Sequence, residues 1–321
     1  MQDHLNKHVW LIGAGQMAIS YSAVLEAMGA DLTVIGRGKK SSDAFAAETG
    51  KKPEVGGLDA FLARENEPAK FAIVATDILS LDSAAIQLVK AGVKNILIEK
   101  PGSLSCKSLM ELQAAAKAQG CKVSIAYNRR FYSSVRALSE MVEVDGGVSS
   151  CFFEFSEWAD VISQLDVADE VKQRWFLANS THVVDLVFSV IGAPKKITAQ
   201  HSACLSWHRS AGIFVGGGIS EREVPFSWHS NWTGPGRWGI EFVTRKNRYY
   251  LRPMEVLHKT ERGNVDVRPV KIDETLDLEY KPGLYQQVNS FLSGGCNMTC
   301  DLDQHLKHWD FYLEIAGYTD H

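Results

Sequence analysis

The sequence predicts an α/β protein of two domains, in which a doubly wound parallel sheet precedes an α+β domain with a largely antiparallel sheet. Short apolar runs alternate with helical patterns up to about residue 125, which is typical of a parallel sheet covered on both faces. Beyond that point β-rich segments follow one another, which favours antiparallel pairing. The 321 residues suit two domains of roughly 100–200 residues each, so we divide the chain into 1–125 and 126–321.

The first part of the chain has a regular order of expected elements. Strands are expected at 8–12, 32–35, 71–75, 95–98 and 123–126. Helices are expected at 16–28, 79–91 and 107–119. Each helical pattern stops at a glycine, namely Gly29, Gly92 and Gly120, which is a frequent way for a helix to end. This alternation predicts the parallel sheet.

The second part begins with one long helical stretch at 174–191. It is followed by β-rich segments at 197–205, 223–232, 238–243 and 248–252. Clusters of Gly and Pro separate these segments, as expected for turns. Two further helices are expected at 284–292 and 303–318.

Composition and charge exclude several classes of protein. The net charge of −4 gives no electrostatic reason to expect a nucleic-acid partner. No apolar run approaches the roughly 18 residues that would suggest a membrane span. The polar first eight residues lack the order of a signal peptide. Six scattered cysteines form no disulfide framework and no metal site. We therefore expect a cytoplasmic protein with reduced thiols, no metal, no nucleic acid and no membrane contact.

Residues 13–18, with the sequence GAGQMA, stand between the first strand and the first helix. Gly13 permits a tight turn, Gly15 lets the backbone approach a pyrophosphate, and the small Ala18 lets helix and strand pack closely. Backbone N–H groups at the start of the helix then meet the phosphates. This spacing in this context predicts a Rossmann dinucleotide site; the alternative is a plain glycine turn of another α/β fold.

The residues after the second strand bear on which dinucleotide is bound. An acid there would bind the ribose 2′-OH of NAD and repel a 2′-phosphate. The chain has Gly36 at this position and Arg37 next to it. A missing carboxylate and a guanidinium favour NADP, with NAD as the second choice. The alternative is that Arg37 is a surface residue of a basic loop that continues through Lys39, Lys40 and the following serines.

Glu99, Lys100 and Pro101 end the fourth strand, at the sheet edge where open α/β sheets bind their ligands. Proline restricts the backbone of Lys100 and hence the directions open to its side chain. A lysine here can donate a hydrogen bond to a carbonyl oxygen as a hydride arrives, or stabilise an alkoxide in the reverse direction. The alternative is an exposed turn.

These motifs together resemble the Gfo/Idh/MocA oxidoreductases. The resemblance includes GAGQMA at 13–18, Ala75 and Thr76 after the third strand, IEKPG at 98–102, NRRF at 128–131 and HVVD at 182–185. It covers nearly the whole chain, and the combination is far more specific than any one motif. It implies hydride transfer between nicotinamide and a carbinol carbon, usually of a sugar, cyclitol or sugar derivative. It also implies a second domain that often mediates homodimers or homotetramers.

The resemblance and the motifs assign roles to individual residues. Cofactor contacts are expected from Gly13, Gly15, Gln16, Met17, Arg37, Thr76 and Glu99. Catalytic roles are expected for Lys100 and His182. Substrate contacts are expected from Asn128, Arg130, Asn179 and Asp185.

One departure from the family pattern concerns the second domain. The family commonly has an Asp four residues before the histidine, whereas this chain has Ala178 four residues before His182. Asn179 or Ser180 can hydrogen-bond a substrate there, but neither is an acid or a base. The segment from Asn179 to His182 resembles a branch associated with surface-polysaccharide sugars. The alternative for His182 is a core histidine of an amphipathic helix.

Two other functions remain open besides a sugar oxidoreductase. Ala178 favours a catalytically silent dinucleotide-binding regulator, and retained Lys100 and His182 oppose it. A dehydrogenase or reductase of a non-sugar substrate is also compatible with the fold, because function is set by the site. Tryptophans gather in the second domain, where they pack sheets or stack on sugars. They are Trp158, Trp175, Trp207, Trp228, Trp232 and Trp238.

Overall fold

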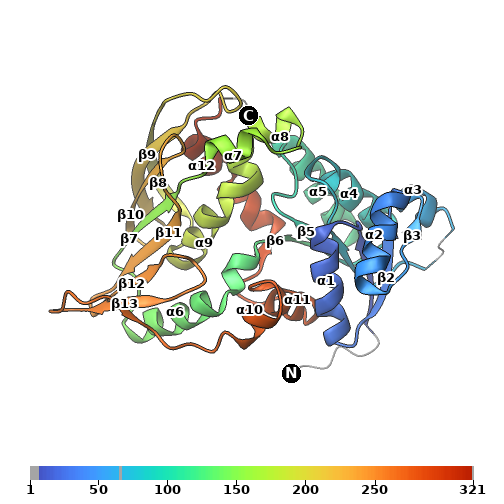
Figure 1. Cartoon of the computed structure of the whole chain (residues 1–321), viewed down its shortest axis with the longest axis horizontal. Coiled ribbons are helices and arrows are strands. Elements are labelled where there is room, and N and C mark those ends of the chain that lie inside the picture. The colour runs from blue at the N-terminus through green and yellow to red at the C-terminus, as the bar shows by residue number, and fades with distance from the viewer. Residues whose placement is uncertain (1–6, 65–66, 320–321) are drawn as a thin grey trace. The chain divides into compact units, whose positions relative to one another are not determined.

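The computed structural model describes residues 7–64 and 67–319 (Figure 1). Its described residues form two compact units, and each is described by itself here. The first unit comprises the chain up to Asn128 together with Leu276–Leu306, and the second comprises Arg129–Thr275 together with the chain from Lys307. Residues 1–6, which make up most of the segment used to judge a signal peptide, lie outside the described residues.

The first unit is built on a seven-stranded sheet with the order β15-β6-β5-β4-β1-β2-β3. The six strands β1 to β6 pair in parallel, and the short β15 is antiparallel to β6. Their bounds are β1 His8–Ile12, β2 Asp31–Gly36, β3 Glu54–Val55, β4 Phe71–Val74, β5 Asn95–Glu99, β6 Lys122–Ala126 and β15 Cys300–Asp301. The predicted doubly wound parallel sheet is confirmed.

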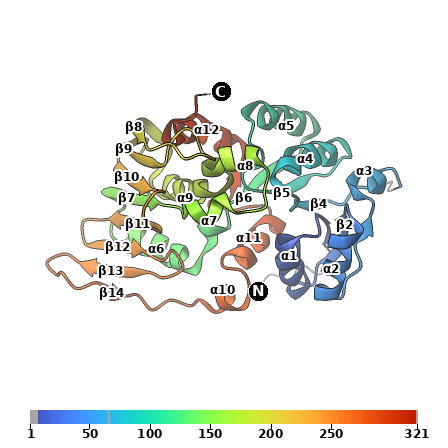
Figure 2. The same ribbon diagram turned by 45° about the horizontal axis from the view of Figure 1, so that its top comes forward.

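Helices cover both faces of this sheet, with α1 and α2 on one side and α4 and α5 on the other (Figure 2). The helices are α1 Gln16–Ala27, α2 Lys39–Thr49, α3 Gly57–Leu62, α4 Leu81–Lys90 and α5 Cys106–Gln119, with a 3₁₀ turn η1 at Ile78–Ser80. The central strand β4 is buried at every residue, because helices cover both its faces. The expected basic loop ends at Gly38, and α2 begins at Lys39.

Residues 276–306 return to the first unit, which a single division at residue 125 did not include. The helices here are α10 Thr275–Glu279 and α11 Leu284–Leu292. The reason is apolar packing: Leu284 and Val288 of α11 join Val24 and Leu25 of α1 in one core cluster. Burying this face of α11 requires α1, which lies more than two hundred residues earlier in the chain.

The second unit is built on an eight-stranded sheet with the order β14-β13-β12-β11-β7-β10-β9-β8. Every pairing is antiparallel except that of β7 with β10. The bounds are β7 Ser150–Phe155, β8 Pro194–Ser202, β9 Ile213–Ser220, β10 Pro225–Asn231, β11 Trp238–Val243, β12 Asn247–Leu251, β13 His258–Glu261 and β14 Arg268–Pro269. The predicted α+β domain with a largely antiparallel sheet is confirmed.

Helix α9, Thr181–Ile191, packs on β7 and β11 of this sheet. It is apolar almost all round, and nine of its residues are buried. The helical stretch expected at 174–191 is present, but its first turn, η3 at Phe176–Ser180, is π-helical and leads directly into α9. The short α8, Asp169–Gln173, precedes it. The remaining helical elements are α6 Ser133–Val144, α7 Ala159–Ser163, α12 Leu302–Ala316 and the 3₁₀ turn η2 Asn128–Phe131.

The part of the chain that the structure describes has neither a membrane-spanning helix nor a cluster of metal ligands. Among residues 7–64 and 67–319, no helix has the length and apolar character needed to cross a membrane. Within the same ranges, no group of three or more His, Cys, Asp or Glu residues could hold a metal ion.

Candidate functional site

A cavity of about 710 Å³ opens at the carboxyl ends of β1, β2 and β4 in the first unit. Six of the seven residues expected to contact the cofactor line it: Gly13, Gly15, Gln16, Met17, Arg37 and Thr76. Ligands of open α/β sheets bind at this edge, where strand order reverses. The cavity is therefore the candidate dinucleotide site.

Gly13 and Gly15 shape this cavity in different ways. Gly13 has φ +116°, and a Cβ there would lie 2.3 Å from the carbonyl oxygen of Ala75, so only glycine fits. A Cβ at Gly15 would meet no atom within 4 Å, so its backbone is open to a ligand. Gly15 is the N-cap of α1, and the first turn of α1 has no acid. These features suit the pyrophosphate of a dinucleotide.

Gly36 lies against the side chain of Ser42 in α2. A Cβ at Gly36 would lie 2.2 Å from Oγ of Ser42, so a larger residue there requires the Ser42 hydroxyl to turn away. Arg37 follows, and its Nη2 lies 3.6 Å from Oδ2 of Asp77, which lines the same cavity. Both side chains are largely exposed, and such ion pairs contribute little to stability. The guanidinium can therefore exchange Asp77 for a ligand phosphate.

Glu99, the seventh expected cofactor residue, is not among the residues that line this cavity. Its Oε1 accepts a hydrogen bond of 2.7 Å from the hydroxyl of Tyr21 in α1. Burial raises the pKa of Glu99, although the Tyr21 hydrogen bond and the Lys100 charge act to lower it. Lys100 follows at the end of β5, and the Lys100–Pro101 peptide bond is cis. Tyr21 was missed because its apolar spacing in α1 indicates only a core residue.

Asn128 follows β6 at the same edge of the first unit. Its Nδ2 donates to the carbonyl oxygen of Pro282 at 2.9 Å. The side-chain amide of Gln287 is satisfied when its oxygen faces the backbone after β6. In that orientation the oxygen accepts hydrogen bonds from the N–H groups of Tyr127 and Asn128 at 3.2 and 3.0 Å. Sequence analysis missed Gln287, because no local pattern identifies a polar residue of α11 that hydrogen-bonds the backbone after β6, which lies far earlier in the chain.

Arg130 and Asp185 bind each other in the second unit. Arg130 Nε and Nη2 donate to the two carboxylate oxygens of Asp185 at 2.7 and 2.6 Å, and the side chains are 1% and 0% exposed. A buried bidentate pair of this kind fixes the elements that carry it. It holds α9 at the position of Asp185, three residues after His182. Direct substrate contact by either residue stays a prediction.

His182 lies in the first turn of α9 and is 5% exposed. Its ring centroid is 6.2 Å from that of Trp238 at the start of β11. The guanidinium of Arg129 lies 4.5 Å from the centre of the Trp238 ring, which is a cation–π distance. Trp238 thus contacts both His182 and Arg129.

A pocket of about 370 Å³ lies in the second unit beside these residues. Trp238, Arg129 and Asn179 line it, together with Trp158, Trp175 and Glu157. Of the four expected substrate residues, only Asn179 is among its lining residues. Glu157 was missed, because a single acid after a strand carries no motif.

The tryptophans divide into two groups. Trp228 and Trp232 are 1% exposed and belong to the core, and Trp207 stacks on Trp232 with ring centroids 6.0 Å apart. The other three line the pocket, and the Trp158 indole donates to the carbonyl oxygen of Gly236 at 3.1 Å. Packing therefore accounts for the first group, while the second group forms part of the pocket wall.

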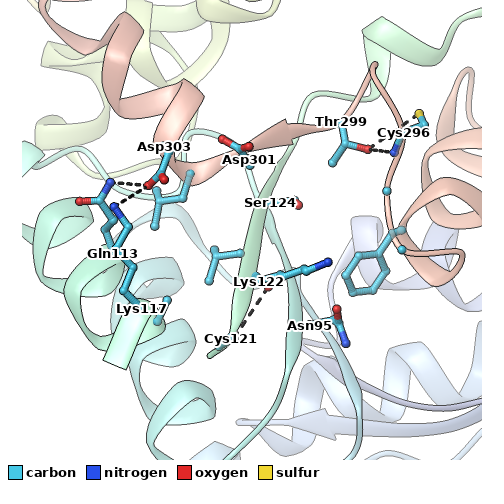
Figure 3. A pocket seen from close by; sticks show the side chains of 16 residues that line it. Asn95, Gln113, Lys117, Cys121, Lys122, Ser124, Cys296, Thr299, Asp301 and Asp303 are labelled. Carbon is cyan, nitrogen blue, oxygen red and sulfur yellow. Dashed lines mark hydrogen bonds and ion pairs between the residues drawn. The ribbon is translucent and has the colours of Figure 1, made fainter. Parts of the chain in front are cut away.

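Another pocket, of about 530 Å³, lies at the amino ends of β5 and β6 (Figure 3). Asn95 and Lys122 begin these strands, so the pocket is at the opposite sheet edge from Glu99 and Lys100. Asp303 is held there by Lys117 at 3.2 Å. Burial raises the pKa of the Cys121 thiol to about 11, which keeps it protonated and unreactive at neutral pH. None of the predicted site residues lines this pocket.

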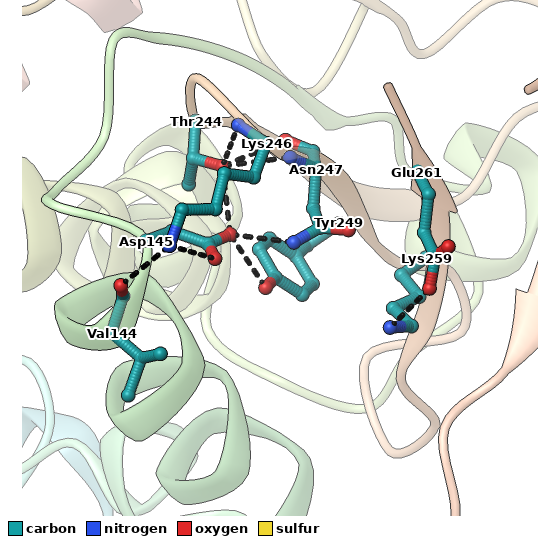
Figure 4. Close-up of polar contacts among 8 residues, drawn as sticks. All are labelled: Val144, Asp145, Thr244, Lys246, Asn247, Tyr249, Lys259 and Glu261. Atoms are coloured by element: carbon teal, nitrogen blue, oxygen red, sulfur yellow. Dashed lines mark hydrogen bonds and ion pairs between the residues drawn. The ribbon is translucent and has the colours of Figure 1, made fainter. Parts of the chain in front are cut away.

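A polar cluster around Asp145 closes the turn between β11 and β12 (Figure 4). Asp145 Oδ2 accepts hydrogen bonds from Thr244, Asn247 and Tyr249 at 2.8, 2.7 and 2.8 Å. Burial acts to raise the pKa of Asp145, but these three hydrogen bonds and the Lys246 charge outweigh it and lower the pKa. The cluster ties the end of α6 to the hairpin and is structural.

Residues 7–127 match the model of an oxidoreductase family with an NAD-binding Rossmann fold, GFO_IDH_MocA. No curated protein sequence matches the chain. Among solved structures, UDP-N-acetylglucosamine 3-dehydrogenase GnnA from Acidithiobacillus ferrooxidans has a TM-score of 0.76 and 16% identity, covering 98% of each chain.

Two more solved structures are similar over nearly their whole length. The WlbA dehydrogenase from Bordetella pertussis, in complex with NADH and UDP-GlcNAcA, has a TM-score of 0.72 and 16% identity, covering 98% of this chain and 96% of its own. An inositol dehydrogenase homolog from Azotobacter vinelandii, complexed with NADH and myo-inositol, has a TM-score of 0.75 and 13% identity, with the same coverage. At these identities the similarity shows the fold.

Proposed function

We propose that this chain, whose residues 7–127 match the model of the Gfo/Idh/MocA oxidoreductase family, transfers a hydride to or from a sugar derivative. The reacting carbon is a carbinol carbon in one direction and a carbonyl carbon in the other. The bound nicotinamide supplies the hydride chemistry. The observation that carries the proposal is the glycine-shaped cavity at the carboxyl ends of β1, β2 and β4.

Lys100 and His182 have distinct roles in this proposal. The ammonium of Lys100 donates a hydrogen bond to the substrate oxygen, where negative charge develops during the reaction. The imidazole of His182 exchanges a proton with the substrate near neutral pH. The buried pair of Arg130 and Asp185 supports the second role, because it fixes the helix that carries His182.

NADP is the proposed cofactor, with NAD as the second choice. Gly36 supports it, since the chain has no carboxylate at this position that would repel a 2′-phosphate. Arg37 also supports NADP, because its guanidinium lines the cavity next to position 36 and suits a phosphate group.

A sugar or sugar derivative is the proposed substrate class. The similar structures include a UDP-N-acetylglucosamine dehydrogenase and a complex with myo-inositol. The tryptophan-lined pocket of the second unit adds support, since aromatic faces suit the C–H faces of sugar rings. By the same resemblance we propose a cytoplasmic homodimer or homotetramer that acts on sugars of surface polysaccharides.

The first experiment titrates NADPH and NADH by fluorescence and then measures nicotinamide absorbance with a panel of sugars, nucleotide sugars and cyclitols. Gly15→Asp is the variant that tests whether the dinucleotide binds in this cavity. The added side chain enters open space, so the protein folds, but the carboxylate repels the pyrophosphate. Dinucleotide binding that survives this change unaltered would contradict the assigned cavity.

Ala178 favours a second candidate function, a dinucleotide-binding regulator without catalysis. The residue is 2% exposed and supplies no acid next to His182. Tight dinucleotide binding with no turnover on the whole panel would favour the regulator. Turnover on a non-sugar substrate alone would keep the chemistry and replace the substrate class.

A further inference from the structure

Glu157 is a buried acid in the tryptophan-lined pocket of the second unit. It is 8% exposed and follows strand β7 by two residues. Its Oε1 accepts hydrogen bonds from Asn179 Nδ2 at 2.9 Å and from Ser180 Oγ at 2.7 Å. These donors are the two residues that follow Ala178, so the carboxylate lies against the turn where the family pattern commonly has an acid.

The residues directly before Glu157 are held by three hydrogen bonds to the neighbouring segment 230–232. The N–H of Phe155 donates to Ser230 Oγ at 2.8 Å, and the Phe155 carbonyl accepts from the Trp232 indole at 3.0 Å. Ser156 Oγ accepts from the N–H of Asn231 at 3.0 Å. A carboxylate on so well-held a strand end keeps its position before any ligand arrives, which is what a binding group requires.

The turn that meets Glu157 is the π-helical turn η3, Phe176–Ser180. Single π-helical turns occur frequently at functional sites. Here the turn stands directly before α9, which carries His182. Trp238 lines the pocket and also contacts the ring of His182, so one tryptophan separates the pocket from the proposed proton-exchanging residue.

We propose that Glu157 is the substrate-binding carboxylate of the second unit, accepting hydroxyl groups of a neutral polyhydroxylated ring in place of the acid absent at position 178. This inference rests on the proposed function and specifies its substrate site. A carboxylate forms charge-assisted hydrogen bonds to hydroxyl donors, which are stronger than neutral ones. Trp158 and Trp175 line the same pocket and offer aromatic faces to the ring.

The test compares Glu157→Gln with Asp160→Asn. Glutamine keeps the size of the side chain and removes its charge. Asp160 is an exposed acid in α7 and does not line the pocket, so it controls for charge alone. The probes are myo-inositol, D-glucose and UDP-N-acetylglucosamine, titrated by calorimetry in the presence of saturating NADP⁺.

For the best-binding probe, Glu157→Gln should raise Kd and KM by roughly 10- to 100-fold, the usual effect of a hydrogen bond to a charged group. The turnover number should change less than KM, and the Kd of NADP⁺ should stay the same. Asp160→Asn should alter none of these quantities. Unchanged probe affinity in folded Glu157→Gln protein overturns the inference. Glu157 would then have only a structural role, through its hydrogen bonds to Asn179 and Ser180 of η3.

A crystal structure of the unmodified protein with the probe bound is a second test, and it does not depend on whether the Glu157→Gln variant folds. A ring hydroxyl within hydrogen-bond distance of Glu157 supports the inference, and a ring bound elsewhere overturns it. The two proposals also fail separately. Glu157-dependent binding without any turnover refutes the proposed function alone, whereas turnover that Glu157→Gln leaves unchanged refutes this inference alone.

Discussion

The two ligand pockets of this protein are built in different ways. In the first unit, the cavity depends on backbone geometry, since Gly13 leaves room for the Ala75 carbonyl and Gly15 opens the start of α1. In the second unit, the pocket depends on side chains from separate segments, such as Glu157, Asn179 and Trp238. A short run of sequence therefore specifies the candidate cofactor site, whereas the proposed substrate pocket forms only after the second unit has folded.

The largest expected effect tests the first unit. Lys100→Met should lower turnover by about 10²- to 10⁴-fold, the usual contribution of a general acid–base group. Dinucleotide affinity should remain nearly the same, because Lys100 does not line the cofactor cavity. Single-turnover kinetics and fluorescence titration measure the two quantities. An equal loss of both would make Lys100 a cofactor-binding residue instead.

The next effect tests the second unit. His182→Ala should lower turnover by about 10²-fold or more, since it removes the proposed proton-exchanging group. Turnover per folded molecule and melting temperature are measured on one preparation. Reduced stability with unchanged turnover would make His182 a core residue.

Restoring an acid with Ala178→Asp should change substrate preference more than rate, because Glu157 already supplies a carboxylate there.

A smaller effect concerns cofactor preference. NADPH should bind more tightly than NADH, and Arg37→Ala should narrow the difference by about 1.5–3 kcal/mol, the range for hydrogen bonds to charged groups. Asp77→Asn is the matched variant. It releases the guanidinium from its ion pair and should slightly strengthen NADPH binding. Tighter binding of NADH to the unmodified protein would refute the preference.

The smallest effect lies outside both pockets, at Asp145. Its pKa is lowered in the folded protein, so its stabilising effect is present above about pH 4, the unfolded value, and is lost as pH falls through the folded value. Asp145→Asn should cost about 1 kcal/mol at pH 7 and less at pH 3. Urea unfolding across this range checks it, with the exposed Asp166→Asn as control. Parallel curves for Asp145→Asn and the unmodified protein would contradict it.

The parts of the fold that sequence predicted well are those set by local periodicity. Strands β1 and β11 have the predicted bounds, because uninterrupted apolar or alternating runs between turn residues leave few alternatives. Long-range packing decided the rest. Residues 276–306 return to the first unit because α11 needs α1 to cover its apolar face. The helical stretch predicted at 174–191 begins with the π-helical turn η3, and apolar spacing alone cannot distinguish π-helical from α-helical geometry over a single turn.

By itself, the sequence determined the dinucleotide motif, because a strand, a glycine turn and a helix start are set within a few residues by backbone sterics. It also located Lys100 at a strand end and His182 on a helix. Only the tertiary structure decided which polar groups meet. It paired Arg130 with Asp185, placed the Ser42 hydroxyl against Gly36 and brought Glu157 to Asn179. Contacts between distant residues depend on how sheets and helices pack, and no local pattern carries that information.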